Sequence, residues 1–335
     1  MATLQQDKIQ LPKVIFGTSA LGNLYTALDE LTKLAIVQEC IIHSPKPVVF
    51  DSAGKYGAGL ALESLGKSLK ALGVNPADVL ISNKLGWIRT ELKTEEPTFE
   101  PGVWKDLKND AVQNISYDGI MECFRQGNEL LGEYTPQMVS VHDPDEYLAA
   151  ASDEADAEKR YQDILDAYRA LADLKVSGQV KAVGVGSKDW KVIERISKDV
   201  ELDWVMIANS MTIHSHPADL LVFMDEINKK GITIINSAVF NAGFLIGSDY
   251  YNYRLVDKNT DPELFAWREK FFAICEKHDV KPAEACVKFG LSAPGVSTIA
   301  LNTSSAKRVK GNIEMSEVQI PDIFWTELKV EGLID

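Results

Sequence analysis

The sequence is short of basic residues. Its 35 Lys and Arg face 49 Asp and Glu, which gives a formal net charge of −14 at pH 7. A chain of this charge repels, on average, a nucleic-acid backbone or an anionic membrane surface. We therefore expect neither a nucleic acid nor a membrane as a partner.

Cysteine is scarce and long apolar runs are missing. The four cysteines, Cys40, Cys123, Cys275 and Cys286, form no CxxC pair, so no zinc or redox motif is indicated and buried free thiols are expected. No stretch has the apolar length of a membrane-spanning helix, and the N-terminal MATLQQDKIQLPK lacks the features of a secretory signal. These absences predict a cytoplasmic protein.

Short β-branched runs alternate along the chain with segments in which apolar residues recur three and four positions apart. The runs predict strands near residues 14–18, 47–51, 79–82, 138–142, 182–186, 204–208, 233–236 and 297–301. Between and after them, helices are predicted over residues 31–42, 59–72, 119–131, 161–175, 190–197, 220–230, 265–278, 282–289 and 304–312.

This alternation is typical of a parallel sheet that helices cover. Eight repeats in 335 residues favour an α/β fold of the (β/α)8 TIM-barrel type over an open doubly wound sheet. No linker or internal repeat divides the chain, so one domain over residues 1–335 is predicted. Two long loops, 85–116 and 247–262, follow strands and therefore belong to the C-terminal face, where barrel active sites are built.

Four ionisable side chains stand at or just after consecutive strand ends. Asp51 ends the second predicted strand, and Tyr56 follows in DSAGKYGAG. Lys84 lies just after the third strand in ISNKLGW, and His142 ends the fourth in VSVHDPDEY. Because parallel strands of a barrel end at one face, we expect these four side chains to converge at its mouth.

Together the four groups suit proton transfer to and from an alcohol or carbonyl oxygen. A free tyrosine has a pKa of about 10, and a neighbouring ammonium such as Lys84 lowers it. Asp51 would keep that lysine charged, and His142 would hydrogen-bond the substrate oxygen. Tyr56 is then the general acid or base, while a cofactor carries the hydride.

The same segments resemble the aldo-keto reductases, and the resemblance spans essentially the whole chain. FDSAGKYGAGLALESLGKSL is similar to that family's Asp-x4-Tyr-Gly signature, SNKLGW to its lysine segment and VHDPD to its histidine segment. The resemblance implies a catalytic tetrad of Asp51, Tyr56, Lys84 and His142, and a nicotinamide cofactor bound without a Rossmann fold. Consistently, no G-x-G-x-x-G follows a strand.

Other segments are similar to the branch of the family that oxidises free aldoses at C1, such as L-fucose, D-threo-aldose and L-galactose dehydrogenases. These segments are HDPDEY, VGVGSKDW, SAVFNAGFLIG and SYDGIMECFRQGNELLG. The resemblance implies oxidation of a sugar hemiacetal to a lactone. Two alternatives stay open: an NADPH-dependent reductase of small aldehydes or ketones, and a cofactor-binding regulatory subunit, because barrels of this family also serve as channel-associated subunits.

The resemblance also implies a set of cofactor contacts. ALNTSSAKRVKGN keeps the family's Arg308 and Asn312 but has Asn302 and Thr303 where the family has Lys and Ser. Losing that ammonium removes a contact to a 2′-phosphate, which favours NAD, while Arg308 keeps NADP open. Ser237 replaces the tyrosine that usually stacks on the nicotinamide. The implied contacts are Gly17, Thr18, Ser187, Asn209, Ser237, Phe240, Gly243, Leu245, Asn302, Thr303, Arg308 and Asn312.

Three further expectations concern the substrate, metals and assembly. Trp87 in the first long loop is predicted to form an apolar floor for a sugar ring, whereas Trp104 is more simply a packed residue. His214 and His216 form an H-x-H pair without a third ligand in view, so no metal is expected. The partner is a small sugar or carbonyl compound, and the chain is a monomer or a small homo-oligomer.

Overall fold

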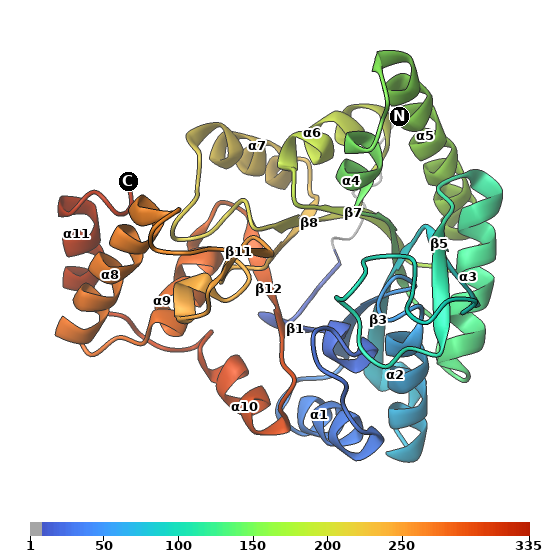
Figure 1. The fold of residues 1–335 in the computed structure, drawn as a ribbon, viewed down its shortest axis with the longest axis horizontal. Helices are drawn as coiled ribbons and strands as arrows, with labels where there is room; N and C mark the ends of the chain where they lie inside the picture. The colour runs from blue at the N-terminus through green and yellow to red at the C-terminus, as the bar shows by residue number, and fades with distance from the viewer. Residues whose placement is uncertain (1–8) are drawn as a thin grey trace.

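The barrel is built from eight parallel strands. A computed structural model describes residues 9–335, in which these strands close in the order β1-β12-β9-β8-β7-β6-β3-β2 (Figure 1). They are β1 (Val14–Gly17), β2 (Val48–Ala53), β3 (Val79–Leu85), β6 (Met138–His142), β7 (Ala182–Ser187), β8 (Trp204–Ala208), β9 (Thr233–Ser237) and β12 (Val296–Asn302). The predicted TIM barrel is confirmed. Residues 1–8, which belong to the predicted domain and to the segment examined for a secretory signal, lie outside the described residues.

Helices surround the barrel because their apolar faces pack on its outer surface. They are α1 (Glu30–His43), α2 (Leu60–Ala71), α3 (Tyr117–Leu131), α5 (Glu154–Val176), α6 (Trp190–Asp199), α7 (Ala218–Lys229), α9 (Pro282–Ser292) and α10 (Ala306–Glu314). Helix α5 begins earlier than the predicted residue 161, because Asp153 caps it by accepting a hydrogen bond from the Asp156 amide at 2.8 Å. Its first turns are mostly exposed, so apolar spacing gave no signal there.

Further elements are appended to this frame. Helix α4 (Pro144–Ala149) directly follows β6, and α8 (Pro262–Lys277) packs with the C-terminal α11 (Asp322–Val330). Helices α4 and α11 were not predicted, since α4 is a short turn after a proline and α11 follows no barrel strand directly.

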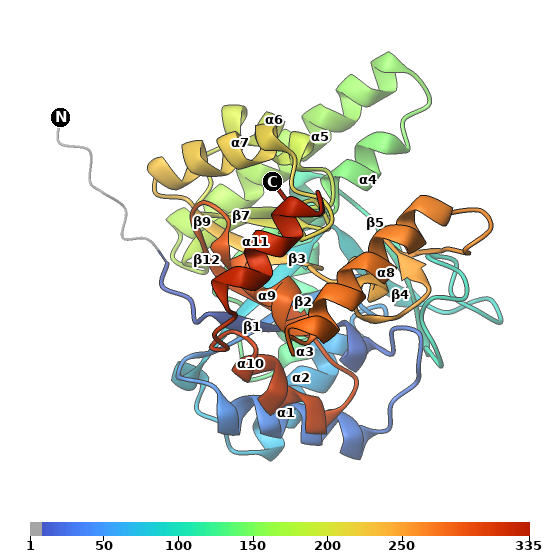
Figure 2. The ribbon, with the colours of Figure 1, turned by 90° about the vertical axis from the view of Figure 1, so that its left-hand side faces the viewer.

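The two long loops contain antiparallel hairpins that were also not predicted. The loop after β3 holds β4 (Trp87–Glu91) paired with β5 (Asn109–Gln113), and the loop after β9 holds β10 (Tyr250–Tyr251) paired with β11 (Arg254–Leu255). Figure 2 shows β4, β5 and α4 on one side of the barrel. The long loops therefore cover the C-terminal face, as expected.

The lower interior of the barrel is a packed apolar layer. Trp204 is fully buried there beside Ile15, Val49, Met138 and Ile235. A Cβ placed at Gly184 on the neighbouring strand would lie 2.1 Å from the Trp204 ring, so only glycine leaves room for the indole. The interior is thus filled below the polar strand ends, and any ligand must bind above them.

All four cysteines are free and buried, as predicted. Over residues 9–335 we find no helix with the length and apolarity to cross a bilayer.

Candidate active site

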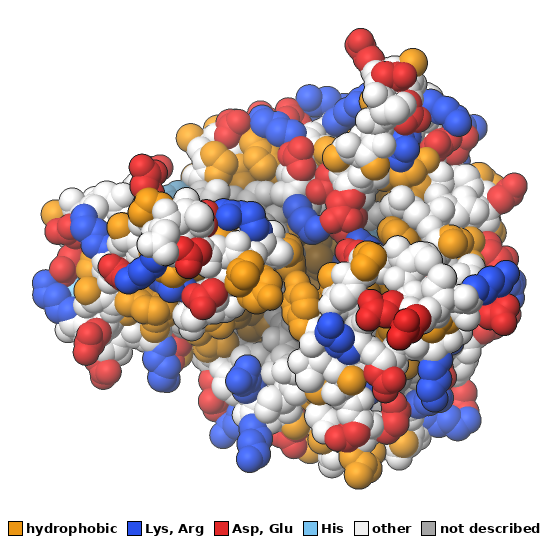
Figure 3. All heavy atoms as spheres, in the orientation of Figure 1, with side chains coloured by type: hydrophobic (Ala, Val, Ile, Leu, Met, Phe, Trp, Pro, Cys, Tyr) orange, Lys and Arg blue, Asp and Glu red, His pale blue; other side chains and the backbone are white. Residues whose placement is uncertain are grey.

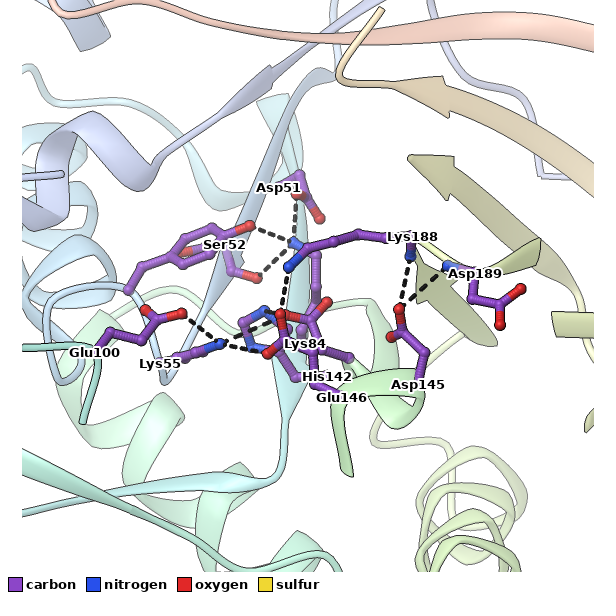
Figure 4. Close-up of polar contacts among 12 residues, drawn as sticks. Asp51, Ser52, Lys55, Lys84, Glu100, His142, Asp145, Glu146, Lys188 and Asp189 are labelled. Carbon is purple, nitrogen blue, oxygen red and sulfur yellow. Dashed lines mark hydrogen bonds and ion pairs between the residues drawn. The ribbon is translucent and has the colours of Figure 1, made fainter. Parts of the chain in front are cut away.

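Three neighbouring strands bring the predicted tetrad together. Asp51 lies in β2, Lys84 in β3 and His142 at the end of β6, and these strands are adjacent in the barrel. The Lys84 Nζ lies 2.5 Å from Asp51 Oδ2 and 3.2 Å from the Tyr56 hydroxyl (Figure 4). The Tyr56 and His142 rings meet edge-on with centroids 5.5 Å apart. One cation therefore links the carboxylate to the phenol.

A glycine-rich turn after β2 holds Tyr56 in place. Gly57 has a φ of +60°, and a Cβ on it would lie 2.2 Å from the Gly22 carbonyl oxygen. The same close approach excludes a side chain at Gly22, whose Cβ would meet the Tyr56 backbone at 2.8 Å. The glycines of KYGAG thus let the turn press against the loop after β1.

For both Lys84 and Tyr56, burial and the charge of the nearest partner shift the pKa in opposite directions. Burial disfavours the charged form of Lys84, but the charges of Asp51 and Tyr56 outweigh burial and raise the pKa of this lysine. Burial also raises the pKa of Tyr56, and the Lys84 ammonium only partly offsets it because Asp51 and Asp143 raise it further. The lysine acts in the expected direction. The expected net lowering of the tyrosine pKa is wrong for the chain by itself.

His142 is held neutral. Burial, together with the charges of Lys55 and Lys84, lowers its pKa well below 6.5. Its Nδ1 is buried without a hydrogen-bond partner, and its Nε2 lies 3.4 Å from Asp143 Oδ2. A neutral imidazole at this position can donate one hydrogen bond to an oxygen between it and the phenol.

The predicted cofactor residues lie on the other arc of the barrel. They follow or end the contiguous strands β1, β12, β9, β8 and β7, on the same face as the tetrad. Asn209, just after β8, is in the left-handed region with a φ of +60°, and its Oδ1 is buried without a partner. An unpaired amide oxygen at this place fits the carboxamide of a nicotinamide. Leu245 is fully buried in the core, and its contact with the cofactor stays a prediction.

The remaining residues of this arc have local partners. The Thr18 hydroxyl donates to the Asp51 carbonyl at 3.1 Å and the Ser187 hydroxyl to the Asp189 carbonyl at 2.9 Å. The Ser237 hydroxyl lies 3.4 Å from the Ile207 carbonyl. Phe240 is half-buried in the following loop, and Gly243 has a φ of +94° at the start of the 3-10 turn Phe244–Ile246.

The end of β12 and the start of α10 carry the predicted cofactor contacts Asn302, Thr303, Arg308 and Asn312. The Asn302 amide donates to the Ser19 hydroxyl at 2.6 Å, and Arg308 is exposed on α10 together with the half-buried Asn312. The first residue of the helix is Ala306 rather than Ser304, and Ser305 precedes it as the N-cap. Ser305 makes no side-chain cap, whereas Thr303 accepts a hydrogen bond from its amide at 3.1 Å.

The space-filling view shows that this face is open at its centre. In Figure 3 the surface is hollowed over the barrel mouth, with lysine or arginine and acidic side chains on the wall of the hollow. The tetrad therefore lies beneath a depression that a small molecule can enter.

A model of the Aldo/keto reductase family matches residues 13–330. The chain belongs to this family. It is therefore an NAD(P)-dependent oxidoreductase that acts on a small carbonyl or sugar compound.

Curated relatives of this aldo-keto reductase are distant but cover nearly all of it. Pyridoxal 4-dehydrogenase of Microbacterium luteolum is 27% identical over an alignment of 329 residues that covers 95% of this chain and 93% of that protein. D-threo-aldose 1-dehydrogenase of a Pseudomonas species is 27% identical over 345 residues, 97% and 95% of the two chains. L-galactose dehydrogenase of Arabidopsis thaliana is 20% identical over 314 residues, 93% and 86%.

Solved structures share the fold. A holo-form aldo-keto reductase from Bacillus halodurans superposes with a TM-score of 0.68 at 19% identity, covering 99% of this chain and 97% of that one. Glycerol dehydrogenase from Gluconobacter oxydans also gives 0.68, at 14% identity, covering 98% and 95%.

In this aldo-keto reductase, Trp104 rather than Trp87 packs on the tyrosine of the tetrad. The ring centroids of Trp104 and Tyr56 are 5.8 Å apart, and only 7% of Trp104 is exposed. The Trp104 indole donates to Glu100 Oε2 at 2.6 Å. Trp87 is half-buried against Phe99, with the Lys55 ammonium 5.2 Å from its ring centroid. Within residues 9–335, ring contacts connect Trp87 to Tyr56 only through Phe99 and Trp104.

The sequence prediction also missed a charged cluster beside the tetrad, made of Lys55, Glu100, Asp143, Glu146 and Lys188. The Lys55 side chain is only 4% exposed, and its Nζ lies 2.9 Å from Glu100, 3.0 Å from Glu146 and 3.6 Å from Asp143 (Figure 4). Lys188 pairs with Glu146 as well. Although burial raises the pKa of Glu146, the two lysines lower it to about 2. Their position was the available signal in the sequence. Asp143 and Lys188 directly follow β6 and β7, and Lys55 lies two residues after β2.

The H-x-H pair has other contacts. His214 Nδ1 lies 2.9 Å from the Tyr251 hydroxyl, and His216 Nδ1 lies 3.1 Å from the Thr212 carbonyl oxygen. Over residues 9–335, no three or more His, Cys, Asp or Glu side chains are grouped to hold a metal ion.

Proposed function

We propose that this enzyme oxidises a free aldose at C1, converting the cyclic hemiacetal to a lactone, with NAD as the preferred cofactor. The observation that carries the proposal is the Lys84 Nζ, 2.5 Å from Asp51 and 3.2 Å from the Tyr56 hydroxyl, beneath an open face. This arrangement suits a phenol that exchanges a proton with a substrate oxygen.

The proposed roles follow from the contacts. Tyr56 is the general base, and its phenolate accepts the proton of the C1 hydroxyl. The Lys84 ammonium stabilises that phenolate before the proton is transferred. Asp51 keeps the ammonium charged. Neutral His142 donates its hydrogen bond to the same oxygen and aligns C1. A nicotinamide bound on this face would supply the hydride acceptor for C1.

The choice of substrate class rests on the relatives. Two of them are named for oxidising sugars, D-threo-aldose and L-galactose. A third is named for pyridoxal, which carries an aldehyde beside a hydroxymethyl group and closes to a cyclic hemiacetal. A cyclic hemiacetal is thus the functional group that these substrates share, and a sugar also suits the charged, hydrogen-bonding wall of the hollow.

The preference for NAD rests on the arc that ends at α10. We assign the dinucleotide to Gly17, Thr18, Ser187, Asn209, Ser237, Phe240, Gly243, Asn302, Thr303, Arg308 and Asn312. Asn302 carries no charge, so Arg308 alone supplies a cation to a 2′-phosphate from this set. One guanidinium leaves NADP usable but gives it less advantage than a Lys-Arg pair.

The test is a panel of free aldoses, pyridoxal and small aldehydes, each assayed with both cofactors by absorbance at 340 nm. We expect NADH formation with an L-fucose-like aldose and a higher kcat/KM with NAD than with NADP. A Tyr56→Phe variant should lose about 10²- to 10⁴-fold in kcat. Consumption of NADPH with small aldehydes, and no oxidation of any hemiacetal, would establish the reductase instead.

A further inference from the structure

Asp143 occupies an unusual place beside the tetrad. It follows His142 at the end of β6, and its backbone is left-handed, with φ +45° and ψ 58°. Asp29, Asp153 and Asp189 stand at the same N-cap position of other helices, and each accepts a hydrogen bond from its own helix. Asp143 makes no such cap to α4. Its carboxylate is therefore not used to begin the helix.

That carboxylate is directed at the tetrad instead. Its Oδ2 lies 3.4 Å from His142 Nε2 and 3.6 Å from Lys55 Nζ, and 17% of the side chain is exposed. Burial raises the pKa of Asp143 above its ordinary value, and the charges of Lys55 and Lys188 only partly offset that rise. The same charge raises the pKa of Tyr56, which works against the phenolate. A carboxylate kept here by two lysines therefore does not serve the proton transfer directly.

An ionised carboxylate only accepts hydrogen bonds, so a ligand that reaches it must bring a donor. We place the donating proton of the neutral His142 ring on Nε2, which then contacts the oxygen on C1, and Asp143 Oδ2 lies 3.4 Å from this nitrogen. In an aldose, the hydroxyl adjacent to that oxygen is the one on C2. From these placements we propose that Asp143, supported by Lys55, binds the C2 hydroxyl and makes the enzyme selective for 2-hydroxy hemiacetals. This inference rests on the proposed function and narrows its substrate class.

The expected selectivity follows from the kind of hydrogen bond. A bond from a hydroxyl to a charged acceptor is worth about 1.5–3 kcal/mol, which corresponds to about 10- to 150-fold in kcat/KM. When a 2-deoxy sugar is bound, Asp143 still has Lys55 as a partner. The loss in kcat/KM for that sugar should therefore stay within this range and not reach the larger losses seen when a buried polar group is left without any partner.

The experiment compares one good aldose with its 2-deoxy counterpart, first in the native enzyme. We expect kcat/KM for the 2-deoxy sugar to be about 10- to 150-fold lower. Asp143→Ala and Asp143→Asn should reduce this ratio to about threefold or less, mainly by slowing the 2-hydroxy sugar. The matched control is Asp153→Asn, an exposed N-cap in which asparagine caps as well as aspartate, and it should keep the native ratio.

The outcomes separate the two proposals. A native enzyme that oxidises both sugars equally well overturns the role of Asp143, and this measurement needs no variant to fold. Variants that retain the native ratio overturn it too, while aldose oxidation itself stands. If no aldose is oxidised with either cofactor, the proposed function has failed, and the role of Asp143 fails with it.

Discussion

Replacing Lys84 by methionine should lower both stability and activity strongly, whereas Tyr56→Phe should lower activity strongly and stability only slightly. The Lys84 and Asp51 side chains are 5% and 4% exposed, so methionine leaves a carboxylate buried without its cation. Breaking a buried pair from one side costs about 3–5 kcal/mol of unfolding free energy. Tyr56→Phe removes only one hydrogen bond of 3.2 Å, worth about 1 kcal/mol.

A double variant identifies the cause. In Asp51→Leu/Lys84→Met both charges are absent, and replacing a buried pair by apolar residues is often neutral. We expect this protein to recover most of the stability lost in Lys84→Met while its activity stays low, because Tyr56 still lacks its cation.

The assay is urea unfolding of all four proteins followed by fluorescence, with kcat measured on the same preparations. A lower midpoint at unchanged slope reports lost stability. The reasoning is refuted if Lys84→Met unfolds at the native midpoint, or if the double variant is as unstable as the single one. The first result would mean that Asp51 is not left as a buried unpaired charge, and the second that lost packing explains the effect.

Two further predictions concern pH and packing. Because burial raises the pKa of Tyr56, the fraction of phenolate grows throughout the range below that pKa, so kcat/KM for oxidation should rise by up to about tenfold per pH unit from pH 7 to 10. His142, whose pKa is well below 6.5, should add no inflection near neutrality, and a flat oxidation profile would contradict this assignment. Gly184→Ala should lower the unfolding free energy by about 1–3 kcal/mol, because its Cβ would lie 2.1 Å from the Trp204 ring. Gly311→Ala, where a Cβ meets nothing within 4 Å in helix α10, should instead be neutral or stabilising by thermal melting.

The barrel and its tetrad were predictable because both depend on local and periodic signals. Parallel strands buried on both faces read as short apolar runs, and a polar residue that ends such a run must face the barrel mouth. Asp51, Lys84 and His142 meet this condition, and the glycines around Tyr56 marked a tight turn.

The rest depended on contacts between loops distant in sequence. Trp104 reaches Tyr56 only because the segment before β5 folds back and Glu100 pairs with Lys55. No periodicity specifies such a pairing. The resemblance implied a cofactor contact for Leu245, but no periodicity indicated that this side chain would be buried in one cluster with Phe265 and Phe271 of α8. The hairpins β4–β5 and β10–β11 were missed because their strands are short and partly exposed.

The order of the strands has a consequence for how such an enzyme changes over time. Asp51, Lys84 and His142 stand on the adjacent strands β2, β3 and β6, whereas Asn302 stands at the end of β12 and Arg308 on α10, and β1 separates β12 from β2. Under the proposed assignment of the dinucleotide to Asn302 and Arg308, a substitution there that changes the preferred dinucleotide leaves the Asp51–Lys84 ion pair in place. Mutations in the proton-transfer residues and in the proposed cofactor contacts can therefore be selected independently of each other during evolution.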